Sequence, residues 1–442
     1  MNIKFTLAAA ASLIATTLPA QIAPLQVTAN TNIVISGLLS VGIKDSQVSQ
    51  GNAAVNRQQP SEFHVDDNTS RLIISSVSKI TDGWNVIFRL ESRFTANVRP
   101  GDPLLPSYAG TNTVYGGGTA AGLAVNDASG FADGDTWGGV SSPFGTIVAG
   151  KSTLYYTDTI SSGYLGASLE APGEGQRIWD ANGLATFNVL STYLTGARSA
   201  TTGVFTPTTK QILGNTRSRN VVRYDSPIFK LDDVSTLNFS LAYSKNPAGS
   251  DPIQPLTPPY SSTYDNGNAV YAKVAYIGHG FTAMGSYLDQ RYSGVPANAA
   301  NSELKANRLG VSYKIEGFKF GLIYDHTDQV NGIATGTALS DAKRTAFLIP
   351  LSFQWDKHGV YFNYGQAGNT SSMDNTGMKQ YNLIYDYALT PRAFLGVYWT
   401  DLKNDSQAFY QPFLTGYSPF GGSNILAGES WKQVGVILNY WF

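Results

Sequence analysis

Apolar and polar residues alternate with a period of two in several segments of the chain. In the last segment, the apolar residues that share one face are Val434, Val436, Leu438, Tyr440 and Phe442. The same alternation occurs over residues 378–388 and again from residue 84. This period predicts β-strands, each with one apolar and one polar face. A soluble sandwich and a membrane barrel both contain such strands, so the period alone leaves the two open.

The lengths of the connections favour the barrel, because short turns alternate with long segments rich in Gly, Asn, Ser and Pro. Short turns are predicted near residues 81–83, 142–144, 278–280, 316–317, 356–358 and 389–391. Long loops are predicted over residues 44–68, 98–132, 152–216, 246–266, 291–303, 329–342, 367–377 and 403–428. Short turns at one end and long loops at the other are typical of a transmembrane β-barrel.

Counting the segments gives sixteen strands, an even number as bacterial barrels require. They are predicted near residues 32, 70, 84, 133, 145, 219, 233, 268, 281, 304, 317, 343, 358, 378, 391 and 430. The predicted fold is therefore all-β: one 16-stranded antiparallel transmembrane barrel with short periplasmic turns and long extracellular loops. We expect this single domain to span residues 30–442.

The first residues have the pattern of an export signal. A lysine at position 4 precedes an apolar run that ends near Ala20. This run is shorter than the ~20 residues of a spanning helix, which argues against the alternative of a retained membrane anchor. We expect a signal peptide over residues 1–29 with cleavage after Ala29, or alternatively after Ala20.

Composition agrees with an exported membrane barrel. The chain has no cysteine, so disulfides cannot stabilise it. Charged residues make up 14% of the chain, below the ~25% usual in soluble domains. The net charge of −1 gives no basic face for nucleic acid. Aromatic residues near strand ends suggest interfacial girdles: Trp84, Phe94, Tyr385, Tyr387, Tyr398, Trp399, Tyr440, Trp441 and Phe442.

Candidate catalytic chemistry is sparse. The four histidines, His64, His279, His326 and His358, fall in or near predicted turns and loops and not in the middle of strands. The glycines at 116–118 lack the strand and helix that flank a phosphate-binding loop. The acidic pairs at 66–67 and 232–233 match no calcium loop. We therefore expect no enzyme activity, no cofactor and no metal.

Several segments resemble the Gram-negative general porins, particularly the trimeric type of β-proteobacteria. They are Thr69–Leu72 with Thr81–Ser92, Phe144–Lys151, Arg219–Pro227, Tyr385–Arg392 and the terminal Phe442. These segments are spread in order over nearly the whole predicted domain. The chain departs from the family where Ile73–Ser76 replaces a glycine-rich strand and where Lys151 replaces the usual arginine. The resemblance is thus to a divergent member.

The resemblance implies an outer-membrane homotrimer whose third long loop, residues 152–216, folds into the barrel and narrows it. The N-terminal strands would form part of the subunit contact. Phe442 would be the signal read by the barrel assembly machinery. The lipid bilayer and lipopolysaccharide would surround the barrel, and nucleic acid would not be a partner.

The resemblance also places basic residues on the wall at the constriction, at the positions of Arg71, Lys151 and Arg217. Strand alternation adds Arg89, Arg93, Arg219 and Arg223 as residues facing the lumen. An arginine facing lipid at the bilayer midplane costs ~2–4 kcal/mol, which favours the inward orientation.

The acidic side of the constriction is predicted on the third loop, where residues 169–175 resemble the acidic tip of the family. The candidates are Glu170, Glu174 and Asp180, with ordinary solvated loop charges as the alternative. Basic and acidic rows facing each other would set up a transverse field across the pore.

The predicted function is passive diffusion of small hydrophilic solutes and ions through a water-filled channel. One alternative is a substrate-selective channel with a binding track on the third loop, built from Tyr155, Tyr156, Trp179 and Tyr193. Another is a surface-binding, adhesin-like barrel that acts through its outer loops.

Overall fold

The computed structural model describes the barrel strands and their short turns. The described residues are 25–28, 30–49, 61–67, 70–93, 132, 134–152, 154, 192–198, 205–212, 218–245, 268–292, 302–335, 338–371, 373–408, 410 and 428–442. None of these residues forms a helix long and apolar enough to cross a membrane.

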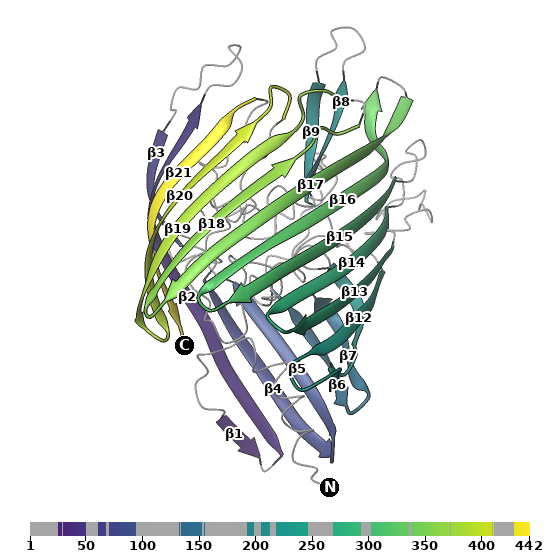
Figure 1. The fold of residues 1–442 in the computed structure, drawn as a ribbon. Helices are drawn as coiled ribbons and strands as arrows, with labels where there is room; N and C mark the ends of the chain where they lie inside the picture. Colours follow the sequence, from purple (N-terminus) through teal and green to yellow (C-terminus); the bar gives the residue numbers. More distant parts are fainter. Residues whose placement is uncertain are drawn as a thin grey trace, which may run out of the picture.

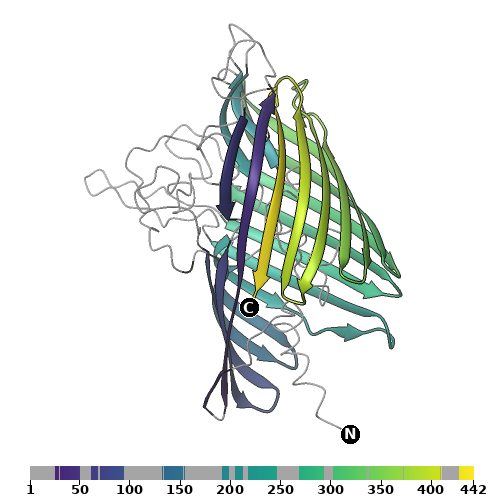
Figure 2. The same ribbon diagram turned by 90° about the vertical axis from the view of Figure 1, so that its left-hand side faces the viewer.

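Sixteen antiparallel strands form a closed, tilted barrel wall (Figures 1 and 2). They are β2 (Thr31–Ser49), β4 (Arg71–Thr81), β5 (Trp84–Arg93), β6 (Thr136–Ser142), β7 (Gly145–Ser152), β10 (Ser218–Asp225), β12 (Thr236–Lys245), β13 (Asn268–Gly278), β14 (Phe281–Tyr292), β15 (Ser302–Ile315), β16 (Phe318–Thr335), β17 (Ala338–Trp355), β18 (His358–Ala367), β19 (Met378–Thr390), β20 (Ala393–Asn404) and β21 (Ser430–Trp441). The predicted fold class and strand number are confirmed.

Five shorter strands accompany the wall: β1 (Leu25–Thr28), β3 (Ser61–Asp67), β8 (Thr192–Arg198), β9 (Phe205–Ile212) and β11 (Phe229–Lys230). β1 turns back on the start of β2, and β3 continues the line of β4 along β2. The hairpin β8–β9 lies within the predicted third loop and meets the end of β16 through two parallel pairings.

The first and last wall strands pair with each other and close the barrel. β2 and β21 are in register from Leu38 opposite Trp441 to Ser49 opposite Ser430. Two backbone hydrogen bonds of 3.1 Å between Gly37 and Phe442 complete this seam. Because every strand of the wall has two neighbours, no wall strand is left with an unpaired edge.

The alternation predicted from the sequence separates the two faces of the wall. On β21, Val434, Val436, Leu438 and Tyr440 are exposed on the outside, whereas Gln433 and Asn439 are buried on the inside. Inward polar groups pair across the seam, since Ser40 Oγ donates to Asn439 Oδ1 (2.6 Å) and Gln433 Nε2 donates to Ser46 Oγ (2.7 Å).

The short turns have the backbone geometry that tight hairpins need. Between β13 and β14, His279 and Gly280 have φ values of 52° and 80°. Two consecutive positive φ angles match the right-handed twist of the strands that they join.

Some predicted boundaries are wrong at the long-loop end. β16 continues to Thr335 and β17 begins at Ala338, where a loop over 329–342 was expected. The loop expected over 44–68 is likewise shorter, because β2 continues to Ser49 and β3 covers Ser61–Asp67. His64 and His326 therefore lie inside strands and not in loops. Two aromatic residues assigned to the girdles, Tyr398 and Trp441, are instead buried on the inner face.

Candidate functional site

The inner face of β4 and β5 carries three charged side chains close together. Arg89 and Glu91 have the inward parity of β5, and the Arg89 guanidinium lies 3.3 Å from the Glu91 carboxylate. Arg71, at the start of β4, lies with its guanidinium 5.2 Å from the centre of the inward Trp441 ring. The predicted inward orientation of Arg89 therefore agrees with its contacts, and Arg71 packs on an inner-wall residue.

A second charged group lies on β10 and β12. The Arg223 Nε donates to both oxygens of Asp225 (2.9 and 3.0 Å), and its Nη2 donates to Ser240 Oγ (3.4 Å). Ser240 Oγ in turn donates to Asp225 Oδ1 (2.5 Å). These bonds fix the guanidinium against the wall, with 12% of the Arg223 side chain exposed.

The far wall carries charged residues that were not among the predicted site residues. On β15 and β16, Arg308 Nε donates to Asp325 Oδ2 (3.0 Å), and both side chains are fully buried. On β17, Arg344 Nη1 donates to the hydroxyl of Tyr410 (2.9 Å), and its guanidinium lies 5.6 Å from the centre of that ring. Each residue has inward strand parity, so the alternation that identified Arg223 could also have identified them.

Strand register joins several of these residues into one row on the inner wall. Asp225, Ser240, Lys273, Ser286, Arg308 and Asp325 are successive register partners from β10 to β16. All have inward parity, so a band of polar and charged side chains crosses six neighbouring strands.

An apolar patch lies directly beside this row, toward the long-loop end of the barrel. It comprises the buried residues Leu154, Val221, Ala242, Ala269, Tyr271, Leu288, Leu304 and Ala306. Leu154 follows the end of β7, whereas the other members belong to β10 and β12–β15. The chain that leaves β7 therefore begins on the inner side of the wall, which agrees with an inward third loop.

Lys151 occupies a different environment from the other wall cations. Its Nζ donates to the carbonyl of Ala132 (2.6 Å), which ties the side chain to the segment before β6. In the alternation of β7, Lys151 has the same parity as the outward-facing Ile147 and Ala149. Its role in a constriction stays a prediction.

The remaining predicted site residues lie partly or wholly outside the residues that the structure describes. Only the backbone of Arg93 and Arg219 is described. Arg217 and the three acidic candidates, Glu170, Glu174 and Asp180, lie outside the described residues. Within the described parts of the chain, no group of three or more histidine, aspartate or glutamate side chains is arranged for a metal.

The outer face is apolar over a broad belt. Leucine, valine, isoleucine and aromatic side chains are exposed there, for example Leu309 (62%), Val434 (55%) and Phe318 (53%). A soluble protein does not expose a belt of this extent, whereas lipid acyl chains cover it in a membrane. The apolar exterior and the polar interior together define a transmembrane channel.

The comparisons with known proteins agree with this class. The family model of the Gram-negative porins matches residues 6–407, so the chain belongs to that family. It is an outer-membrane channel protein that supports passive diffusion. No curated protein matches the chain.

Solved structures share the fold at low sequence identity. The anion-selective porin from Comamonas acidovorans has a TM-score of 0.62 and 17% identity, covering 93% of this chain and 100% of that one. OmpT of Vibrio cholerae in its trimer form has a TM-score of 0.53 and 10% identity, covering 93% and 100%. OmpF of Salmonella typhi, in complex with daunomycin, has a TM-score of 0.51 and 13% identity, covering 95% and 100%.

Proposed function

We propose that this porin forms a constricted pore that prefers small anions. The observation that carries the proposal is the charge of the described inner wall. Basic residues at inward positions include Lys44, Arg71, Arg89, Arg223, Lys273, Arg308, Lys319 and Arg344. The inward acidic residues are fewer and include Glu91, Asp225, Asp325, Asp386 and Glu429. An excess of fixed positive charge raises the local concentration of anions in a narrow aqueous path.

The basic groups lie on opposite sides of the lumen. β4 and β5 carry Arg71 and Arg89, and β15 carries Arg308. Six wall strands separate the pair β4–β5 from the pair β15–β16 in either direction around the barrel. An anion crossing the pore would therefore meet positive charge on both sides. The comparison porin that is anion-selective shares the fold, but the preference proposed here rests on the side chains of this chain.

The constriction itself is proposed to combine Arg71, Lys151 and Arg217 with Glu170, Glu174 and Asp180 of the third loop. The inward position of Leu154, where that loop begins, supports this arrangement. Arg93 and Arg219 would add to the basic side.

Ion selectivity tests the proposal. Reversal potentials across planar bilayers in a salt gradient should have the sign of anion preference. The triple variant Arg71→Gln/Lys151→Gln/Arg217→Gln should shift the reversal potential toward cations, and Lys403→Gln on the outer face should not. Unchanged potentials in the triple variant would refute the constriction, and cation preference in the native protein would refute the charge argument.

A homotrimer is proposed with β2–β7 at the subunit contact. β2, β4 and β7 contain no aromatic residue, whereas every strand from β13 to β19 places at least one aromatic side chain on the outer face. Within β2–β7, β5 does expose Trp84 and Phe88. Because aromatic girdles mark lipid-facing walls, the lack of aromatic residues on β2, β4 and β7 supports contact with protein there. The chain lacks cysteine, so single-cysteine variants allow a direct test. A bifunctional thiol reagent should link subunits carrying Val41→Cys and not those carrying Val311→Cys.

Residues 1–29 are proposed to be removed as a signal peptide; this would also remove β1, which pairs only with the beginning of β2 and is not a wall strand. N-terminal sequencing of the mature protein distinguishes cleavage after Ala29 from cleavage after Ala20.

We also propose that the assembly machinery recognises Phe442 and that the barrel contacts lipopolysaccharide. Transport is proposed to involve no catalytic step.

A further inference from the structure

We propose that the outer face of β13–β17 binds one lipid A unit of lipopolysaccharide. An acyl chain would lie in an apolar groove over Gly285, and a phosphate would bind the basic groups of Arg291 and Lys305. This inference rests on the proposed contact with lipopolysaccharide and assigns a site to it.

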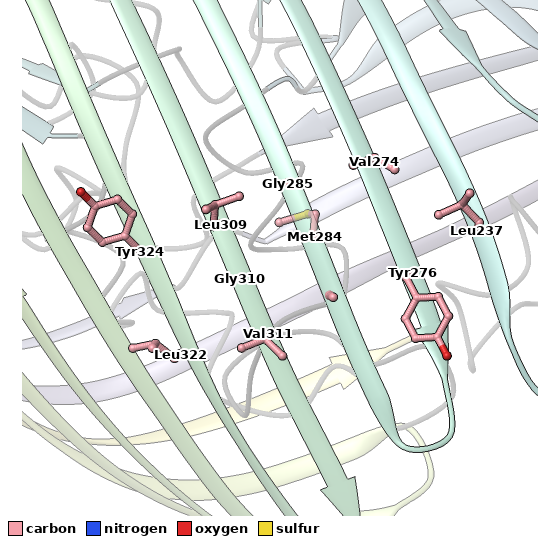
Figure 3. Close-up of a pocket in the computed structure, with 11 residues that line it drawn as sticks. Leu237, Val274, Tyr276, Met284, Gly285, Leu309, Gly310, Val311, Leu322 and Tyr324 are labelled. Carbon is pink, nitrogen blue, oxygen red and sulfur yellow. The ribbon is translucent and has the colours of Figure 1, made fainter.

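The groove exists because small residues lie between large ones on the outer surface. At the groove, the outward positions of β14 are the small residues Ala283 and Gly285. Larger side chains extend from the neighbouring strands, for example Val274, Tyr276, Leu309 and Val311 (Figure 3). The groove has a volume of about 480 Å³ and is lined by Leu237, Val274, Tyr276, Ala283, Met284, Gly285, Leu309, Gly310, Val311, Leu322 and Tyr324. An apolar hollow in a lipid-facing wall accommodates hydrocarbon.

Wall packing does not require the small residue at Gly285. A Cβ atom placed there would be 3.4 Å from Leu309 Cδ2 and 3.8 Å from Val274 Cγ1, which are ordinary contacts. A Cβ atom is therefore accommodated, and a side chain that extends outward from it would fill part of the groove. The hollow is therefore a property of the outer surface that substitution can remove without disturbing the barrel.

A cluster of charged side chains lies on the same strands toward the extracellular end. Arg291 Nε donates to Glu303 Oε1 (3.0 Å), and Lys305 Nζ donates to Glu303 Oε2 (3.0 Å). Arg291 also lies 3.4 Å from Asp289. On β16 and β17, Lys343 Nζ lies 3.2 Å from Asp328. These residues have outward strand parity, so they project toward the membrane surface and not into the lumen.

Within this cluster the basic groups form the outer layer. The side chains of Arg291, Lys343 and Lys305 are 62%, 51% and 43% exposed. The carboxylates beneath them are less exposed, at 16% for Asp289, 24% for Glu303 and 27% for Asp328. The acidic groups hold the cations in place, and the most exposed charged groups of the cluster are basic. Charge-assisted binding of a phosphate is the chemistry that such a surface favours.

The spacing of the groove and the charged cluster matches that of the acyl chain and the phosphate of one amphiphilic lipid. Along β14, Asp289 is four residues from Gly285, or about 14 Å at the rise of an antiparallel strand. Tyr287 lies between them and is 37% exposed, as is typical of an aromatic side chain at a membrane interface. The cluster is at the long-loop end of the barrel, which faces the outside of the cell. A phosphorylated, multiply acylated lipid of the outer leaflet therefore matches the site.

The position on the barrel leaves the site open to lipid. β14 and β15 are separated from the proposed subunit contact at β2–β7 by several wall strands. In a trimer joined through β2–β7, this face would point away from the neighbouring subunits.

Binding of bisphosphorylated lipid A to the purified full-length protein in detergent tests the inference, with native mass spectrometry as the readout. Gly285→Leu and the pair Arg291→Gln/Lys305→Gln should each weaken binding roughly tenfold. Lys403→Gln is the matched control, because Lys403 (54% exposed) also covers a carboxylate, Asp401 (5%), but lies away from the groove. It should leave the affinity unchanged.

The outcomes separate the site from the channel function. All variants should retain the single-channel conductance of the native protein, which shows that the barrel is intact. Native-like lipid A binding by both groove and cluster variants would overturn the inference while leaving the proposed function untouched. Equal affinity for phosphatidylglycerol, lost in the same variants, would also overturn it, because the site would then recognise phospholipids in general.

Discussion

Arg308 and Asp325 form an ion pair across β15 and β16 with both side chains fully buried at an N–O distance of 3.0 Å. Removing one member of such a pair leaves the other charge buried without it, which typically costs 3–5 kcal/mol. We expect Arg308→Met to lower the free energy of unfolding by about this amount, and Arg308→Met/Asp325→Leu to recover most of the loss.

Equilibrium unfolding in guanidinium of the protein refolded into vesicles measures this effect. Arg291→Gln, in the exposed cluster on the outer face, serves as the control and should leave the unfolding midpoint unchanged. A similarly small effect of Arg308→Met would contradict a structural role for the buried pair.

The ring of Tyr398 on β20 packs directly against Gly435 on β21, where a side chain would otherwise lie. A Cβ atom at this position would lie 2.5 Å from the ring, whose hydroxyl donates to Gln433 Oε1 (2.8 Å). Gly435→Ala should displace the ring and destabilise the barrel by about 1–3 kcal/mol. Gly138→Ala on β6 is the control, since its Cβ would have no neighbour closer than 3.9 Å. Equal thermal stability of the two variants would show that the ring moves at no cost.

The turn before β12 is stabilised by Asp232. Its Oδ1 accepts hydrogen bonds from the amides of Val234 (2.8 Å) and Ser235 (2.7 Å). Hydrogen bonds from Ser235 and Val234 hold the pKa of Asp232 well below its usual value, with a smaller contribution from His279. A lowered folded-state pKa means that the stabilisation is present above the unfolded-state pKa and is lost as the pH falls through the folded-state value.

Hydrogen exchange measures the persistence of this turn. The protection factors of the Val234 and Ser235 amides should stay constant as the pH falls through the ordinary aspartate range near 3.9. Asp232→Ala should remove the protection at all pH values. Loss of protection in the native protein already at pH 4–5 would argue against a lowered pKa.

Phe442 completes the seam by pairing with Gly37 and by filling the space beside it. A Cβ atom on Gly37 would lie 2.5 Å from the Phe442 ring. If Phe442 is also the assembly signal, Phe442→Ala should reduce the amount of folded barrel in the outer membrane far more than it reduces refolding from urea into detergent. Equal losses in both assays would assign Phe442 a structural role only.

The sequence predicted the features that depend on neighbouring residues. Strand parity is local, so the inward orientation of Arg89 and Arg223 could be derived from the residues beside them. The same alternation predicts an inward orientation for Lys273, Arg308 and Arg344. These residues were not among the predicted site residues, because the resemblance to the family indicated positions on the N-terminal strands only.

Features that depend on distant pairing could not be derived. The contact of Arg71 with Trp441 requires the register of the seam, which joins the two ends of the barrel. β16 and β17 extend into residues 329–342 because backbone pairing does not need a regular alternation of apolar and polar residues. The hydropathy pattern therefore placed a loop where a hairpin forms.

Single-channel conductance in planar bilayers shows whether the barrel is a water-filled pore. The purified protein should insert in discrete steps, and each step should give a current that rises linearly with voltage and increases with salt concentration, as a water-filled pore requires. Current that saturates with salt or is blocked by one class of solute would favour the substrate-selective channel, and the absence of any conductance step from folded, inserted protein would contradict the account.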